Sequence, residues 1–112
     1  MALATKILGQ GRYNDTNNHD LYTVPTSTEA TITNLNIANV TASAITARVF
    51  VVPPTKTAVA STAIVWDFTI PGNDYHRLIE NGKLMLETSA KITVQNGTAN
   101  SLTFTLSGIE KT

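Results

Sequence analysis

The clearest pattern in the sequence is an alternation of apolar and polar residues between positions 63 and 70. One parity is apolar throughout and carries Ile64, Trp66, Phe68 and Ile70. A period of two is typical of a half-buried β-strand, so we expect this set to face the core and Val65 and Asp67 to face away from it. Pro71 and Gly72 then fit a type II turn, because Pro fixes φ at its first central position and Gly accepts a positive φ at its second.

Similar short patterns recur along the chain and predict about eight strands, with helix signals weak throughout. The expected strands cover Thr5–Gln10, Leu21–Val24, Glu29–Ala38, a row of Ile45, Ala47, Val49 and Val51 ending before Pro53, Ala63–Ile70, Arg77–Glu80, Lys83–Leu86, Lys91–Gln95 and Leu102–Leu106. Asn81-Gly82 is the dipeptide favoured in two-residue hairpins, and it disfavours the alternative of a helix over residues 78–90. The pattern predicts an all-β fold, an antiparallel β-sandwich or jelly-roll-like barrel.

Two breaks in the alternation predict β-bulges. The apolar parity changes between Ile32 and Leu35, which places one bulge near Thr33-Asn34. Gly108 shifts the parity near the C-terminus, so we expect Ile109 to return to the inner face. We assign residues 1–112 to one domain and residues 1–19 to an extended N-terminal arm, whose deletion should leave the fold intact.

Composition supports the all-β prediction and narrows the choice of partners. The chain has 19 Thr, 9 Ile and 8 Val, and these β-branched residues favour sheets. Only 14% of residues are charged and the net charge is zero, which argues against nucleic-acid binding and against electrostatic docking on a membrane. With no cysteine, disulfides and thiolate metal sites are excluded. Neither a signal peptide nor a membrane-spanning stretch is expected.

Candidate chemistry is sparse. The polar segment of residues 11–20 could offer oxygen ligands and His19 to a hard cation, but it lacks the Gly and the final Glu of an EF-hand, so we interpret it as an exposed loop. Asp74 and His76 suggest a proton relay, yet no nucleophile motif accompanies them. Asp67 could pair with Arg48 or Arg77. We therefore predict no enzyme and no catalytic, cofactor-binding or metal-binding residue.

Four aromatic residues could in principle form a platform for a sugar. These are Tyr13, Tyr22, Trp66 and Tyr75. We expect Trp66 to belong to the core instead, because it shares a parity with other large apolar residues.

Several segments resemble small structural proteins of tailed bacteriophages. They are Lys6-Ile-Leu-Gly-Gln10, Asp20-Leu-Tyr-Thr-Val-Pro25, Phe50-Val-Val-Pro53, Ile70-Pro-Gly-Asn-Asp74 and the closing Ser107-Gly-Ile-Glu110. The resemblance covers most of the chain, although residues 11–19 are longer and more polar than in the commoner pattern. It implies a β-sandwich that sits on the head or the tail of the virion, often as a trimer or a ring, and that carries no catalytic residues.

The resemblance leads us to expect a capsid decoration (cement) protein on the virion surface, made in the host cytoplasm. It would bind the outer face of the head as a homotrimer and clamp neighbouring subunits of the major capsid protein. The expected partner contacts are Lys6, Ile7, Leu8, Arg12, Tyr13, Phe50, Val65 and Met85. The alternatives are a tail or baseplate accessory protein, a carbohydrate-binding adhesin module using exposed Tyr and Asn, and a small hydrolase.

Overall fold

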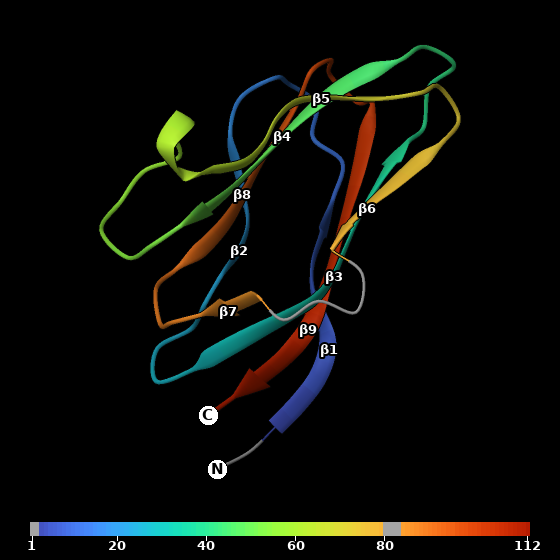
Figure 1. Cartoon of the computed structure of the whole chain (residues 1–112). Coiled ribbons are helices and arrows are strands. Elements are labelled where there is room, and N and C mark those ends of the chain that lie inside the picture. Colours follow the sequence, from blue (N-terminus) through green and yellow to red (C-terminus); the bar gives the residue numbers. More distant parts are fainter. Residues whose placement is uncertain (1–2, 80–83) are drawn as a thin grey trace.

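A computed structural model describes residues 3–79 and 84–112, and over these ranges the chain forms two antiparallel β-sheets (Figure 1). The strands are β1 (Leu3–Gly11), β2 (His19–Thr23), β3 (Glu29–Asn39), β4 (Ile45–Val52), β5 (Ala63–Ile70), β6 (Tyr75–Ile79), β7 (Leu84–Leu86), β8 (Lys91–Asn96) and β9 (Leu102–Lys111). A single turn of 3₁₀-helix, η1 (Ala60–Thr62), precedes β5. The predicted β-sandwich is confirmed.

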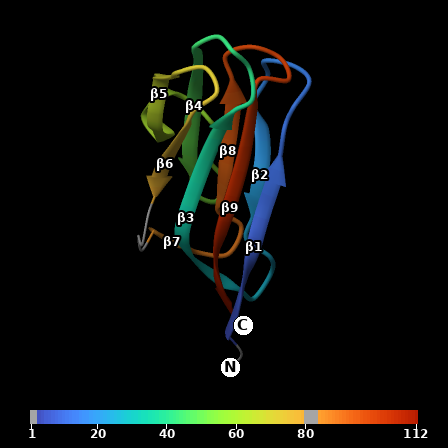
Figure 2. The same cartoon turned by 90° about the vertical axis from the view of Figure 1, so that its right-hand side faces the viewer.

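The pairing of the strands is that of a long hairpin rolled up on itself. β1 pairs with β9, β2 with β8, β3 with β6 and β7, and β4 with β5. Two further pairings, β3 with β9 and β4 with β8, then join the arms of the hairpin into sheets of order β1-β9-β3-β6 and β2-β8-β4-β5. This order is that of a jelly roll in which β6 and β7 together occupy the place of one strand. Figure 2 shows both ends of the chain at the same end of the sandwich.

The core lies between the two sheets and is built from alternate residues of their strands. Its least exposed side chains are Ile32, Leu35 and Ile37 of β3, Val49 of β4, Ile70 of β5, Ile92 and Val94 of β8, and Leu102, Phe104 and Leu106 of β9. Between them stand Thr, Asn and Ser, which cover the outer faces of the sheets. Nine of the 19 Thr lie in strands and the other ten lie in the connections between them or at the C-terminus, so the threonine content is shared between the sheets and the loops.

The strand β3 contains the predicted bulge, but the expectation for the end of β9 is wrong. The register of β3 against β9 shifts between Ile32 and Asn34. After Gly108, however, the alternation simply continues, so that Ile109 stays on the outer face and Glu110 is buried. Glu110 is accommodated there because it has two polar partners, described below.

The prediction of which side chains of β5 face the core is wrong for most of the strand. Val65 and Ile70 are buried in the core, whereas Ile64 and Trp66 face the solvent on the outer side of the sheet. Two register shifts against β4 place extra residues in β5, and Asp67 takes up a left-handed backbone conformation with φ of 54°. These irregularities break the simple alternation on which the prediction rested.

The hairpin predicted around Asn81-Gly82 is also wrong, although the dipeptide itself lies outside the described residues. β6 and β7 are both antiparallel to β3, so they run in the same direction and cannot form a hairpin with each other. At the other end of the chain, the predicted edge strand Thr5–Gln10 is confirmed as part of β1. Residues 3–11 of the expected arm thus belong to the sandwich.

Candidate functional site

The most unusual surface of the described chain lies along the edge strand β5. Three large apolar side chains stay exposed here: Ile64 at 47%, Trp66 at 50% and Phe68 at 41%. We call these three residues the β5 strip. Scattered apolar residues are normal on a protein surface, but neighbouring large ones on one strand usually mark a contact with another molecule.

Trp66 is held in place by a charged pair on its own side of the sheet. The guanidinium of Arg48 lies 3.6 Å from the centre of the indole ring. Arg48 donates from Nε and Nη2 to the two carboxylate oxygens of Asp67, over 2.7 and 3.1 Å. Hydrogen bonding to Arg48 lowers the pKa of the Asp67 carboxyl. One of the two predicted partners of Asp67 is thereby confirmed, and the stack presents a flat surface of indole and guanidinium.

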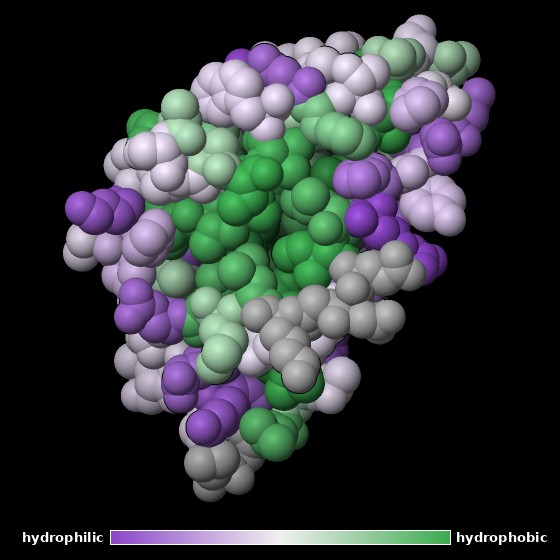
Figure 3. Space-filling model, viewed as in Figure 1, coloured by the Kyte–Doolittle hydropathy of each residue, from purple (hydrophilic) through white to green (hydrophobic). Residues whose placement is uncertain are grey.

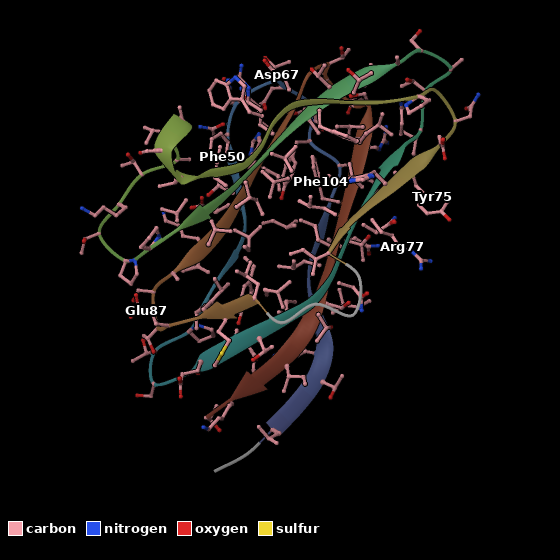
Figure 4. All side chains as sticks on the ribbon, viewed as in Figure 1. Phe50, Asp67, Tyr75, Arg77, Glu87 and Phe104 are labelled. Carbon is pink, nitrogen blue, oxygen red and sulfur yellow. The ribbon has the colours of Figure 1, made fainter. Side chains whose placement is uncertain are left out.

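Phe50 explains why Trp66 faces outward. Its neighbour Val49 points into the core, so Phe50 points to the outer side of the sheet, where it is only 2% exposed and lies edge-on to Trp66 with ring centres 6.3 Å apart. The outer face of this sheet thus has a small apolar cluster of its own. Figure 4 shows Phe50 and Asp67 on the side of the molecule that carries β4 and β5.

Phe68, the third member of the strip, lies where the two sheets approach each other. Its ring packs against the ring of His76 on β6, with centres 4.4 Å apart. Figure 3 shows hydrophobic surface gathered in a hollow between the edges formed by β5 and by β6. On this side Leu78, Ile79 and Leu84 are only half-buried. The β5 strip therefore borders an apolar hollow.

The expected partner contacts are only partly on the surface. Phe50 and Val65 are buried, which corrects their assignment as contact residues, because both pack within the protein itself. Ile7 and Met85 are exposed, at 62% and 74%. Leu8 is half-buried against the core. Met85 also lines a cavity of about 470 Å³ together with Leu3, Glu29, Thr31, Pro53, Ile109 and six others.

The remaining predicted contacts take part in internal bonds. The Lys6 ammonium lies 2.6 Å from a carboxylate oxygen of Glu110, whose other oxygen accepts a bond of 2.5 Å from the hydroxyl of Tyr22. Arg12 donates to the carbonyl oxygen of Asn100. Lys6 and Arg12 are still exposed, whereas Tyr22 and Glu110 are buried.

The polar loop between β1 and β2 is an ordered cap, as its contacts show. The ring of Tyr13 stacks on His19 at 4.1 Å, and the imidazole lies 2.6 Å from Asp15, whose pKa it lowers through a hydrogen bond. Asn96 donates from its side chain to the carbonyl oxygens of Tyr13 and Asp15. Over the described ranges, no group of three or more acidic or histidine side chains is placed to hold a metal ion.

The structure does not bring together the residues of the other two candidate sites, the proton relay and the sugar platform. Asp74 accepts a bond from the amide of Tyr75, while His76 lies against Phe68, so the suggested relay is not formed. The four aromatic residues of the suggested sugar platform lie apart: Tyr22 is buried and bonded to Glu110, Tyr13 stacks on His19, and Trp66 and Tyr75 stand on different sheets.

Sequence reasoning missed the β5 strip as a surface, and one signal could have found it. Asp67 interrupts a run of large apolar residues, and Asp tolerates the left-handed conformation that a bulge requires. An acidic residue between Trp66 and Phe68 is thus a hint that the strand is irregular and does not bury both.

Two comparisons with known proteins, one with family models and one with curated proteins, found no relative. No family model matches the sequence, and no curated protein matches it either. Among the described residues no helix has the length and apolar character needed to cross a membrane.

Proposed function

We propose that the protein is a structural component of a tailed-bacteriophage virion, namely a capsid decoration (cement) protein that binds the outer face of the head. Its partner would be the major capsid protein, and it would bind as a homotrimer. The resemblance of its segments to small phage structural proteins supports this proposal. The observation that carries it is the β5 strip, an exposed apolar surface on the edge strand β5.

The chemistry of the strip favours a protein partner. Interface centres are enriched in aromatic residues and Arg and depleted in Lys and acidic residues. Here Trp66 and Arg48 are already stacked, and the bidentate bond to Asp67 fixes the guanidinium before any partner arrives. Side chains fixed in advance lose less conformational entropy on binding, which raises affinity without new contacts.

A decoration protein stabilises a shell by mass action. A molecule that binds only the assembled lattice adds its binding free energy to the stability of that lattice. In this proposal the β5 strip replaces Phe50 and Val65 as the principal contact surface. Ile7 and Met85 remain as exposed apolar contacts for neighbouring copies or for the shell.

The test is reconstitution on particles that lack the gene for this protein. Purified full-length protein should restore density on the outer surface of such heads and raise the temperature at which they release DNA. Trp66→Ala should lower its affinity for the heads by about tenfold or more, as expected for the loss of a central interface Trp. Val40→Ala is the matched control, because it changes an equally exposed apolar side chain that lies in the loop between β3 and β4 and does not belong to the strip.

Two outcomes would overturn the proposal. Heads that keep all their outer density without the gene, with only the tail altered, would assign the protein to the tail or baseplate. Equal binding of the Trp66→Ala and wild-type proteins to heads would remove the β5 strip from the interface.

A further inference from the structure

The outer face of the other sheet carries a polar row that crosses four strands. Backbone register aligns Arg77 of β6 with Asn36 of β3, Asn36 with Thr105 of β9, and Thr105 with Gln10 of β1. Gln10 donates from Nε2 to the Thr105 hydroxyl over 3.1 Å. Amide and hydroxyl groups thus stand side by side on a surface where a monomeric protein more often places Lys and Glu.

This row forms part of a groove of about 580 Å³. Its lining consists of Asn34, Leu35, Asn36, Tyr75, Arg77, Ile79, Thr105 and Ser107. The volume lies within the range of about 300–1,000 Å³ found for small-molecule sites. Tyr75 stands at the edge of the sheet with 57% of its surface exposed, and Figure 4 shows it on the same strand as Arg77. The guanidinium of Arg77 lies over the Tyr75 ring, 5.7 Å from its centre, so the groove combines an exposed aromatic ring that has a cation near one face with several polar side chains.

One atom of a residue that lines the groove is left without a partner. The side-chain oxygen of Asn36 is buried and accepts no hydrogen bond from the residues that the structure describes. A buried acceptor without a donor costs about 1–3 kcal/mol, so this oxygen is a local cost to the sheet rather than part of the accessible groove surface. Asn36 also offers two N–H donors, as does Asn34, whose amide can both give and accept a bond.

The charged and polar side chains that line the groove determine which class of ligand it can bind. Among the described residues that line the groove there is no carboxylate, and Arg77 is the one cationic side chain, so these residues do not form the cluster of cations that phosphate groups require. A peptide strand would bind through the backbone of an edge strand, whereas Asn34, Asn36 and Thr105 belong to the inner strands β3 and β9 and offer side chains on the sheet face. Sugars carry hydroxyls that both donate and accept, and their C–H faces pack on an aromatic ring.

We infer that this groove binds a neutral oligosaccharide, with Tyr75 under a sugar ring and the amides of Asn34 and Asn36 bonded to its hydroxyls. The inference goes beyond the proposed function and does not depend on it, because the groove and the β5 strip lie on different sheets. A particle that carries the protein would gain a weak glycan contact, multiplied by the number of copies.

The experiment probes the full-length protein with a printed array of defined neutral and acidic oligosaccharides. The tightest neutral compound is then titrated into ¹⁵N-labelled protein. Tyr75→Ala and Asn34→Ala alter exposed side chains, so they should fold normally and bind about tenfold or more weakly. Val59→Ala, which changes an exposed apolar side chain in the loop before β5, is the control and should bind as wild type. Chemical-shift changes should fall on residues 34–38, 75–79 and 103–107.

Three results would each overturn the inference. The first is an array on which no neutral oligosaccharide binds more strongly to the wild type than to Tyr75→Ala. The second is binding confined to acidic glycans and abolished by added salt, which would show a purely ionic contact. The third is a set of shift changes centred on β4 and β5, with Trp66→Ala as the variant that loses binding.

Discussion

At the scale of single residues, the most informative side chain is Glu110, because it joins both sheets at the edge formed by β1 and β2. Lys6 reaches it from β1 and Tyr22 from β2, and Glu110 itself belongs to β9. Only 9% of the residue is exposed. A buried carboxylate is tolerated only when it is paired and bonded, and here both of its oxygens have a partner.

This arrangement predicts a specific loss of stability in acid. The ammonium of Lys6, and then the hydroxyl of Tyr22, lower the pKa of Glu110 in the folded protein. The unfolded value is about 4.3, so Glu110 contributes stability above that pH, and the contribution is lost as the pH falls through the lower folded value. The difference in melting temperature between the wild type and Glu110→Gln should therefore be constant from pH 7 to about 5 and shrink at lower pH.

The matched control for this prediction is Glu87→Gln, which changes an exposed carboxylate in the turn after β7. Its difference from the wild type should stay small at every pH. A Glu110→Gln variant that remains equally destabilised at pH 3 and pH 7 would contradict the assignment, since the cost would then not depend on the charge of Glu110.

At the scale of elements, alternation predicted where most strands run, including the bulge in β3, because each strand of a sandwich buries one face. It failed on β5 for a physical reason. Both sides of that strand meet apolar groups, since Val65 enters the main core while Trp66 covers Phe50 on the outer side. Alternation divides the side chains of a strand into two sets. It does not say which set enters the main core when both sets bury apolar groups.

The groove around Asn36 was equally hidden from the sequence. It depends on the register of four strands that are distant along the chain, and no local pattern fixes that register. The hairpin prediction failed similarly, because β6 and β7 do not pair with each other and instead pair, one after the other, with successive parts of the long strand β3. The sequence indicated exposed Tyr and Asn as possible sugar ligands. It did not indicate which of these residues lie close together.

Packing between strands at Gly108 gives a prediction at this scale. A Cβ atom placed on Gly108 would lie 2.2 Å from the backbone oxygen of Thr31 and 3.1 Å from a methyl carbon of Leu8. Gly108→Ala should therefore push β9 away from β3 and cost about 1–3 kcal/mol, as overpacking does. Urea unfolding would measure this loss, with Ser107→Ala as the control. That variant alters the preceding residue, whose side chain lies on the outer face. Equal midpoints for the two variants would show that the strands can separate without cost.

At the scale of the whole molecule, the rolled hairpin separates two surfaces of different chemistry. One sheet has the β5 strip at its edge, and the other has the polar groove on its outer face. With zero net charge and few charged side chains, neither surface depends on long-range attraction. The two proposed contacts would therefore form through shape and local bonds, which suits the high local concentration of the particle that we propose.

The same topology predicts that the N-terminus is essential to the fold. β1 covers the edge of β9, brings Leu8 against the core and supplies Lys6 to the buried Glu110. Deleting residues 1–11 should thus cost more than about 2 kcal/mol, which for a chain of this size corresponds to about 10 °C or more in melting temperature. Circular dichroism would measure it, with Ile7→Ser as a control that changes an exposed residue and keeps β1. A truncated protein that melts cooperatively near the wild-type temperature would instead show that residues 1–11 can be detached, as expected from the sequence for the arm of residues 1–19.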